Sequence, residues 1–345
     1  MTAQWHKVYT IRPFNSLGLK PPVPETRLLE DEKNFNYDVN MLNKKPIFIF
    51  GFTGGGTGIL WDIIITYPQC MTPGPEINQL FYHSAKREVI RKLKLYVTAY
   101  ANGFNYNYLK LFNHKNLHVI NYNKMLKNNN FLNYIDQTFY QLKVNRALHH
   151  IYDKYKYPNE VYSIEEAENT RLVTKSIEGA CLAASFWNEV YEDAKFICII
   201  RNGLACAESK LRHKRVRNIL QAAKSYNFIG NYLYKFNQNN ENCLLIRYED
   251  YIDEPQKTIE KIYKHLDLDI KKVQKFKIQS RSNIITNEKE TNKEIGKKYW
   301  YSFDEIDNFF IKDINKKAME NLKKNQIDEF LEIAGDIFYK FNYKI

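Results

Sequence analysis

The sequence predicts an α/β protein of three layers (α/β/α), in which helices cover both faces of a central, mainly parallel sheet and extra helices are attached. Short apolar runs that end at a glycine or a polar turn recur along the chain, and each is followed by a stretch of helical character. This alternation is typical of parallel sheets with helical crossovers. With 44% hydrophobic and 26% charged residues in a chain of 345, the composition lies in the ordinary globular range and provides for a buried core.

The first predicted strand is Pro46 to Phe50, a wholly apolar run that ends at a glycine, as expected of a strand buried on both faces. Ile59 to Tyr67 follows as an apolar segment of helix length. Residues 46–67 together are apolar enough to suggest a membrane span, but the intervening glycines and Asp62 favour a strand, a loop and a helix. Further strands are predicted at Arg171–Thr174, Phe196–Ile200 and Leu244–Ile246.

A glycine-rich loop at residues 51–58 separates the first strand from the first helix. Its backbone N–H groups can turn inward around an anion at the N-terminus of that helix, which is the geometry of P-loop nucleotide-binding folds. Glycines also serve ordinary tight turns, but the position directly after the first strand favours phosphate binding. The residues predicted to hold the phosphate are Thr53, Gly54, Gly55, Gly56, Thr57 and Gly58.

The same loop disfavours chemistry that depends on magnesium and a nucleoside triphosphate. In the triphosphatase loop G-x-x-x-x-G-K-[ST], the lysine reaches the terminal phosphates and the next hydroxyl holds the metal. Gly51 and Gly56 have the matching spacing, but Thr57 and Gly58 stand where the lysine and the hydroxyl are required. We therefore expect no metal at this loop.

The chain is expected to divide into three parts. Residues 1–44 are an irregular lead-in, 45–275 a P-loop-type domain with a helical insertion at about 77–165, and 276–345 a closing segment with helices of the same domain. Aromatic residues in the insertion are expected to make core and helix contacts rather than a substrate groove. The Lys/Asn-rich stretch from Ile270 to Trp300 is typical of a mobile connection, and residues 302–340 predict two closing helices.

Charge and cysteines restrict the partners and the compartment. The formal net charge of +12 attracts polyanions in general, but the sequence has no nucleic-acid recognition module, so we expect no nucleic-acid partner. The five cysteines have neither a CxxC pair nor metal-ligand spacing, which favours a reducing compartment. The first residues lack the apolar segment of a signal peptide. The expected location is cytoplasmic, without a membrane span.

A second motif follows the predicted strand Phe196–Ile200. Arg201 stands at the carboxyl end of that strand, and Ser209 comes eight residues later. An arginine at the strand edge and a serine two turns into the following helix can face one phosphate together.

The order of these motifs resembles the PAPS-dependent sulfotransferase family, where PAPS is 3′-phosphoadenosine 5′-phosphosulfate. The family's loop G-x-P-[RK]-S-G-T-T is approximated by residues 51–58, and its motif R-[DN]-x-x-D-x-x-x-S by Arg201 to Ser209. Leu245–Asp250 and Asp253–Pro255 resemble the family's LRYEDL...DP element, in which we expect Pro255 to begin a helix. The resemblance covers about residues 45 to 270 and implies that Arg201 and Ser209 hold the 3′-phosphate of the cofactor.

The loop departs from the family at one position that matters for catalysis. The family's loop has a lysine or arginine that stabilises charge on the transferred group, where this chain has Gly54. The resemblance makes Lys175 the substitute, because Val173–Ser176 is similar to the family's EKTP strand end; a solvated lysine is the alternative. For the general base the resemblance points to Glu76, ahead of His83, and a surface or substrate-positioning role is the alternative for Glu76.

The resemblance implies transfer of a sulfuryl group from PAPS to a hydroxyl or amine of a carbohydrate, lipid or small-molecule acceptor, with adenosine 3′,5′-bisphosphate as the product and no metal. Two other classes remain open. A P-loop nucleotide kinase or hydrolase would need magnesium and a carboxylate that holds it. A non-catalytic nucleotide-binding relative is favoured by the glycine at position 54. Binding of polyanions by charge alone would show steep salt dependence without nucleotide preference.

Overall fold

The computed structural model describes residues 41–74, 126, 129–149, 154–155, 162–280 and 294–344. Within these ranges the chain forms a sheet of five strands and a smaller sheet of two. Glu76, His83 and most of the expected helical insertion lie outside the described residues. The strands are β1 (Ile47–Gly51), β2 (Cys70–Met71), β3 (Arg171–Ile177), β4 (Lys195–Ile200), β5 (Cys243–Arg247), β6 (Phe276–Gln279) and β7 (Lys298–Tyr301).

The large sheet has the order β2-β3-β1-β4-β5, and every pair of neighbouring strands in it is parallel. β1 lies at its centre, where Ile49 pairs with Lys175 of β3 and with Ile197 of β4. Parallel neighbours require crossover connections, which place helices on the faces of the sheet. The arrangement confirms the predicted α/β class with a central parallel sheet flanked by helices.

Strand β1 illustrates why the apolar runs become strands. Ile47 and Ile49 enter the core on one face of the sheet, and Phe48 and Phe50 enter it on the other. All four side chains are at most 1% exposed. The ring of Phe48 stacks on Trp187 with centroids 5.2 Å apart. Because a strand covered on both faces has no polar side, it appears in the sequence as a continuous apolar run.

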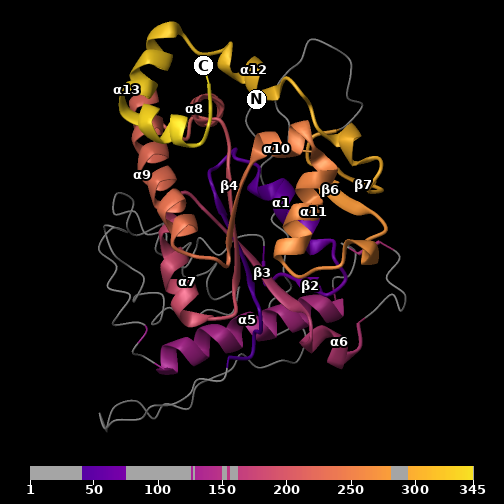
Figure 1. The fold of residues 1–345 in the computed structure, drawn as a ribbon. Coiled ribbons are helices and arrows are strands. Elements are labelled where there is room, and N and C mark those ends of the chain that lie inside the picture. The colour runs from indigo at the N-terminus through magenta and orange to yellow at the C-terminus, as the bar shows by residue number, and fades with distance from the viewer. Residues whose placement is uncertain are drawn as a thin grey trace, which may run out of the picture.

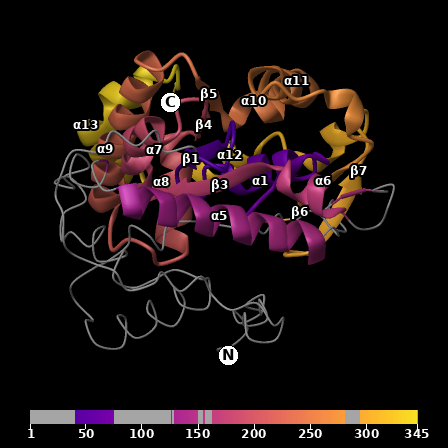
Figure 2. The same ribbon diagram turned by 90° about the horizontal axis from the view of Figure 1, so that it is seen from below.

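Helices form a layer on each face of the sheet (Figure 1). α7, α9 and α13 cover one face, and α1, α10 and α11 cover the other together with the β6–β7 hairpin. α5 packs against β2 and β3, and α6 packs against α5, as the view from below shows (Figure 2). No helix among the described residues is long and apolar enough to cross a membrane. The helices are α1 (Thr57–Ile65), α5 (Asn129–His149), α6 (Ile164–Glu168), α7 (Ala184–Val190), α8 (Gly203–Arg212), α9 (Ile219–Gln238), α10 (Tyr248–Asp253), α11 (Pro255–His265), α12 (Ile314–Met319) and α13 (Lys324–Lys340).

The segment after Ile270 differs from the prediction of a plain connection. It contains β6 and β7, which pair in antiparallel fashion, and β6 packs against α1. Phe276 and Ile278 are fully buried in the core on that side, so two alternating apolar side chains are enough to form a strand within a lysine-rich stretch. α12 and α13 follow where the sequence predicts two closing helices, and Pro255 begins α11 as predicted.

Because the strands of the large sheet are parallel, their carboxyl ends meet at one edge. The loop after β1, the N-terminus of α8 after β4 and the N-terminus of α10 after β5 all lie there. α12 packs on α8 at the same edge, which is the upper end of the sheet in Figure 1. Ligands of open parallel sheets bind outside the carboxyl ends of the strands, so this edge is where a site is expected.

Candidate functional site

The loop between β1 and α1 forms a backbone cradle that depends on two glycines. Gly54 and Gly56 have φ angles of 77° and 93°, in the left-handed region that favours glycine. A Cβ atom on Gly56 would lie 2.5 Å from Cδ2 of Tyr248, and one on Gly54 would lie 3.0 Å from Oγ of Ser209. A larger residue at position 54 therefore has neither the backbone conformation nor the space, which explains why the loop carries no side chain there.

Two N–H groups of the loop already donate hydrogen bonds within the protein, whereas the N-terminus of α1 has no side-chain cap from the described residues. The Gly55 N–H donates to a carbonyl within the loop at 2.9 Å, and the Thr53 N–H donates to Oε1 of Glu178 at 2.8 Å. Gly56 is the N-cap of α1, and no described side chain bonds to the first-turn N–H groups of that helix. At α8, by contrast, the side chain of Asn202 caps the first turn. Of these two helices, α1 is the one that offers N–H groups to an anion.

Glu178 joins the loop to the helices beside it. It follows β3 directly and adopts a φ of 55°, unusual for a residue with a side chain. While Oε1 accepts from the Thr53 N–H, Oε2 accepts from Nζ of Lys210 at 2.9 Å and from Oγ of Ser225 at 3.1 Å. The side chains of Lys210 and Glu178 are 5% and 17% exposed. The lysine thus balances a carboxylate that lies directly against the glycine-rich loop.

Arg201 is held from three directions at the same edge. Its Nη1 donates to the carbonyl of Gly54 at 2.7 Å, and its Nε donates to Oδ1 of Asn315 at 2.7 Å. The guanidinium carbon lies 4.8 Å from the centre of the Tyr248 ring. Burial raises the pKa of Tyr248, so the ring beneath the guanidinium remains a neutral phenol. Since Ser209 also borders Gly54, the structure brings the predicted arginine and serine together at the loop.

Lys175 lies within β3 rather than after it. Its Cα pairs with Ile49 of β1, two residues before the glycine at which the loop begins. Its side chain is on the α1 side of the sheet, with Nζ 5.8 Å from the centre of the Trp61 ring. The residue is only 8% exposed, so the alternative of a solvated lysine is wrong.

Cysteine thiols close to this edge are chemically inert. Burial raises the pKa of Cys206 in α8 to about 12 and raises that of Cys181 further, so both remain protonated. Within the described ranges, no group of three or more His, Cys, Asp or Glu side chains is arranged to hold a metal ion.

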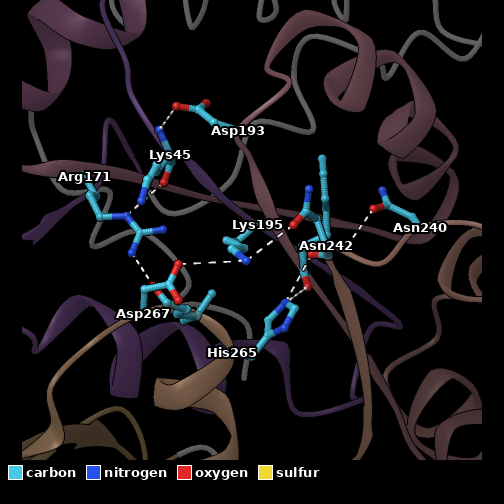
Figure 3. Close-up of polar contacts among 10 residues, drawn as sticks. Lys45, Arg171, Asp193, Lys195, Asn240, Asn242, His265 and Asp267 are labelled. Atoms are coloured by element: carbon cyan, nitrogen blue, oxygen red, sulfur yellow. Dashed lines mark hydrogen bonds and ion pairs between the residues drawn. The ribbon is translucent and has the colours of Figure 1, made fainter.

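A second polar cluster lies at the opposite edge, where the strands begin (Figure 3). Arg171 donates to two backbone carbonyls, one of them at the end of α11. Nε2 of His265 lies 3.1 Å from the carbonyl of Phe196 in β4 and 3.1 Å from that of Asn242, just before β5. Lys195 bonds to Oδ1 of Asn242 at 3.3 Å and lies 3.8 Å from Oδ2 of Asp267. These side chains bond to one another and to the backbone, while Nη2 of Arg171 is buried without a hydrogen-bond partner among the described residues.

The sequence-based interpretation missed several residues that shape the site. Two of them could have been found, because Tyr248 and Glu249 follow β5 as Arg201 follows β4, and ends of neighbouring parallel strands meet at one edge. Glu178 could have been found in the same way, because it directly follows β3. Asn315 does not follow a strand of the large sheet, so its sequence position does not indicate a role at this edge. The missed residues are Glu178, Lys210, Tyr248, Glu249 and Asn315.

Comparisons with known proteins show which family the chain resembles. The model of the sulfotransferase family matches residues 46–272, about two thirds of the chain. No curated protein sequence matches. Among solved structures, the sulfotransferase domain of the Synechococcus PCC 7002 olefin synthase is 15% identical with a TM-score of 0.48, over 88% of this chain and 97% of that chain. The sulfotransferase domain from the curacin biosynthetic pathway is 14% identical with a TM-score of 0.41, over 88% and 99% of the two chains. Mouse sulfotransferase SULT7A1 complexed with PAP is 13% identical with a TM-score of 0.38, over 86% and 89%.

Proposed function

Because this chain belongs to the sulfotransferase family, we propose that it transfers a sulfuryl group from PAPS to a hydroxyl or amine of a carbohydrate, lipid or small-molecule acceptor. The observation that carries the proposal is the pairing of an uncapped α1 N-terminus with a buried arginine at one edge of the sheet. When bound, PAPS supplies an activated sulfuryl group and leaves as adenosine 3′,5′-bisphosphate. The residues present fit a ligand that carries an anionic group at each of its two ends.

In this proposal the loop binds the 5′-phosphosulfate. The N–H groups of Gly54, Gly56, Thr57 and Gly58 and the dipole of α1 stabilise its negative charge. The Thr53 N–H donates to Oε1 of Glu178 at 2.8 Å. This bond stabilises the start of the loop, so the Thr53 N–H does not bind the ligand. The ring of Tyr248 packs closely against Gly56 and so supports the loop at this residue.

Arg201 and Ser209 bind the 3′-phosphate in this proposal. The guanidinium is buried, and a charge-assisted contact to phosphate gains strength where water is excluded. Its face is covered by Tyr248, which leaves the edge of the planar group to meet oxygen atoms. Ser209 adds a hydroxyl donor from the next helix.

The catalytic roles proposed are charge stabilisation by Lys175 and proton removal by Glu76. Lys175 is buried beside α1, so its charge acts with little screening on a group held at the start of that helix. Glu76, which lies outside the described residues, would take the proton from the acceptor oxygen or nitrogen as the new bond to sulfur forms. The five cysteines are all free and buried, which suits a reducing compartment such as the cytoplasm.

Calorimetric titration with adenosine 3′,5′-bisphosphate, AMP and ATP tests the proposal. We expect the bisphosphate to bind at least about tenfold more tightly than AMP, because the second phosphate gains a charge-assisted contact to Arg201. The preference should vanish in Arg201→Ala, and chelators should change neither binding nor turnover. Equal affinity for the bisphosphate and AMP overturns the assignment of the 3′-phosphate.

A turnover assay separates the remaining alternatives. Transfer of labelled sulfuryl from PAPS to a panel of hydroxyl and amine acceptors is the expected result. A strict requirement for Mg²⁺ would instead indicate a kinase or hydrolase. Tight binding of the bisphosphate without any turnover would indicate a non-catalytic relative.

A further inference from the structure

The closing segment of the chain contacts the arginine of the site directly. Residues 273–345 lie beyond the match to the family model, which ends at residue 272. Yet α12 packs on α8, and Asn315 of α12 reaches back across 114 residues of sequence to Arg201. This contact joins two parts of the chain that the family match does not connect.

The orientation of the Asn315 amide follows from its two neighbours. Its Nδ2 donates to Oε1 of Glu249, and its Oδ1 accepts from Nε of Arg201 at 2.7 Å. A carboxylate can only accept a hydrogen bond and a guanidinium can only donate one, so the amide has one arrangement that satisfies both. Asn315 therefore bridges the carboxylate of Glu249 and the guanidinium of Arg201.

Glu249 is itself held in place by two further hydrogen bonds. Its Oε1 also accepts from the N–H of Asn202 at 2.9 Å, and its Oε2 accepts from the hydroxyl of Tyr343 at 2.7 Å. Burial raises the pKa of Tyr343 well above its ordinary value, so this hydroxyl stays a donor. The bonds link Tyr343, Glu249, Asn315 and Arg201 into one chain.

The result is a guanidinium whose plane is set before any ligand arrives. Nε is bonded to Asn315, one Nη1 hydrogen to the Gly54 carbonyl, and one face covers Tyr248. An arginine side chain loses considerable rotamer freedom when it is ordered, and a ligand that meets an ordered one is spared that cost. Without Asn315 the guanidinium can turn about its last bonds, and Nε becomes a buried donor without its acceptor.

We propose that Asn315 is a positioning residue that orients Arg201 for the 3′-phosphate of the cofactor, so that the C-terminal segment completes the nucleotide site. This inference rests on the proposed function of Arg201. It predicts that Asn315→Leu lowers the affinity for adenosine 3′,5′-bisphosphate about tenfold, because a charge-assisted contact loses its geometry. The affinity for AMP, which has no 3′-phosphate, stays within about threefold, since Asn315 acts only through Arg201.

The test is calorimetric titration of the full chain with both nucleotides. The variants are Asn315→Leu, Arg201→Ala and the double variant, with Asn321→Leu as the matched control at an exposed asparagine just after α12. If Asn315 acts through Arg201, Asn315→Leu has no further effect on the ratio of the two affinities once Arg201 is alanine. The control is expected to bind like the wild type.

The outcomes separate this inference from the function on which it rests. A wild type that binds both nucleotides equally removes the role of Arg201 and, with it, the inference. A wild-type preference that persists in Asn315→Leu, or an equal loss of both affinities, overturns the positioning role alone. If Asn315→Leu does not fold, Asn315→Ser takes its place, because its shorter side chain also removes the bridge; retention of the preference in that variant overturns the inference.

Discussion

The two edges of the parallel sheet both carry charged side chains, but these bond to opposite backbone groups. Where the strands begin, cations donate to carbonyls: Lys154 reaches the last turn of α1, and Arg171 the end of α11. Where the strands end, oxygen atoms accept from N–H groups: Glu178 at the loop and Asn202 at α8. The difference follows from the direction of the helices. Their C-terminal carbonyls point to the first edge, and their N-terminal N–H groups point to the second.

The difference between the edges is whether side chains bond to the backbone groups at the helix ends. At the first edge, side chains meet the carbonyls at the ends of two helices: Lys154 at α1 and Arg171 at α11, the latter in the cluster of Figure 3. At the second edge, the first turn of α1 has no side-chain cap among the described residues, and Arg201 is ordered by neutral groups. An incomplete edge with an ordered cation is suited to bind an anion. Substitutions at the two edges should therefore affect different properties.

The largest expected effect separates turnover from binding at the second edge. Lys175→Ala should lower the single-turnover rate of sulfuryl transfer by about 10²–10³, the usual cost of losing one charge-stabilising group. Nucleotide affinity should change little, since such a group acts mainly on the transition state.

Lys195→Ala at the first edge is the matched control for Lys175→Ala and should leave the rate unchanged. Rapid-quench measurement with labelled PAPS gives both rates. A wild-type rate in Lys175→Ala would remove Lys175 from the mechanism and weaken the contrast between the edges.

The next effect tests charge balance beneath the loop. Lys210→Met leaves the carboxylate of Glu178 unpaired beside the cradle, so the free energy of unfolding should fall by about 3 kcal/mol. The affinity for adenosine 3′,5′-bisphosphate should fall as well, because the uncompensated charge repels it. Urea denaturation and calorimetry measure the two effects.

Addition of Glu178→Gln to Lys210→Met removes the repelling charge and should restore most of the affinity. The exposed Lys224→Met, next to Ser225, controls for the loss of one positive charge. If the double variant binds as weakly as Lys210→Met, charge balance is not what the pair provides.

The smallest effect belongs to the first edge and concerns pH. Burial lowers the pKa of His265 below its ordinary value, and the positive charge of Lys195 lowers it further. The hydrogen bonds to two carbonyls and the negative charge of Asp267 oppose this shift. The unfolded chain therefore takes up a proton more readily than the folded one. This contribution to stability is complete above the unfolded pKa near 6.5 and is lost as the pH falls below it.

His265→Gln keeps an amide donor for the carbonyls and removes the titration. Urea denaturation between pH 5 and pH 8 should show a shallower decline of stability in this variant than in the wild type. His213→Gln, at the end of α8, is the comparison for a second histidine with a lowered pKa. Nucleotide affinity should be unchanged by His265→Gln, and a marked loss would show that the two edges are coupled.

The sequence by itself determined the sheet and the loop. Strands buried on both faces leave continuous apolar runs, so β1, β3, β4 and β5 could be located. The loop could be predicted because a strand, a glycine run and a helix are contiguous. Arg201 and Ser209 could be paired because they match a motif of the family, in which a strand end and two helical turns fix the separation of the two residues locally.

Only the tertiary structure decided what supports those residues. Asn315 meets Arg201 across 114 residues of sequence, and Glu178 meets Thr53 across 125. The β6–β7 pairing joins segments that a lysine-rich stretch separates. Each of these contacts depends on how crossovers and closing helices pack on the sheet, and packing of distant segments leaves no spacing pattern in the sequence. Local geometry can therefore be predicted from neighbours along the chain, whereas the partners that orient a buried charge are chosen by the fold.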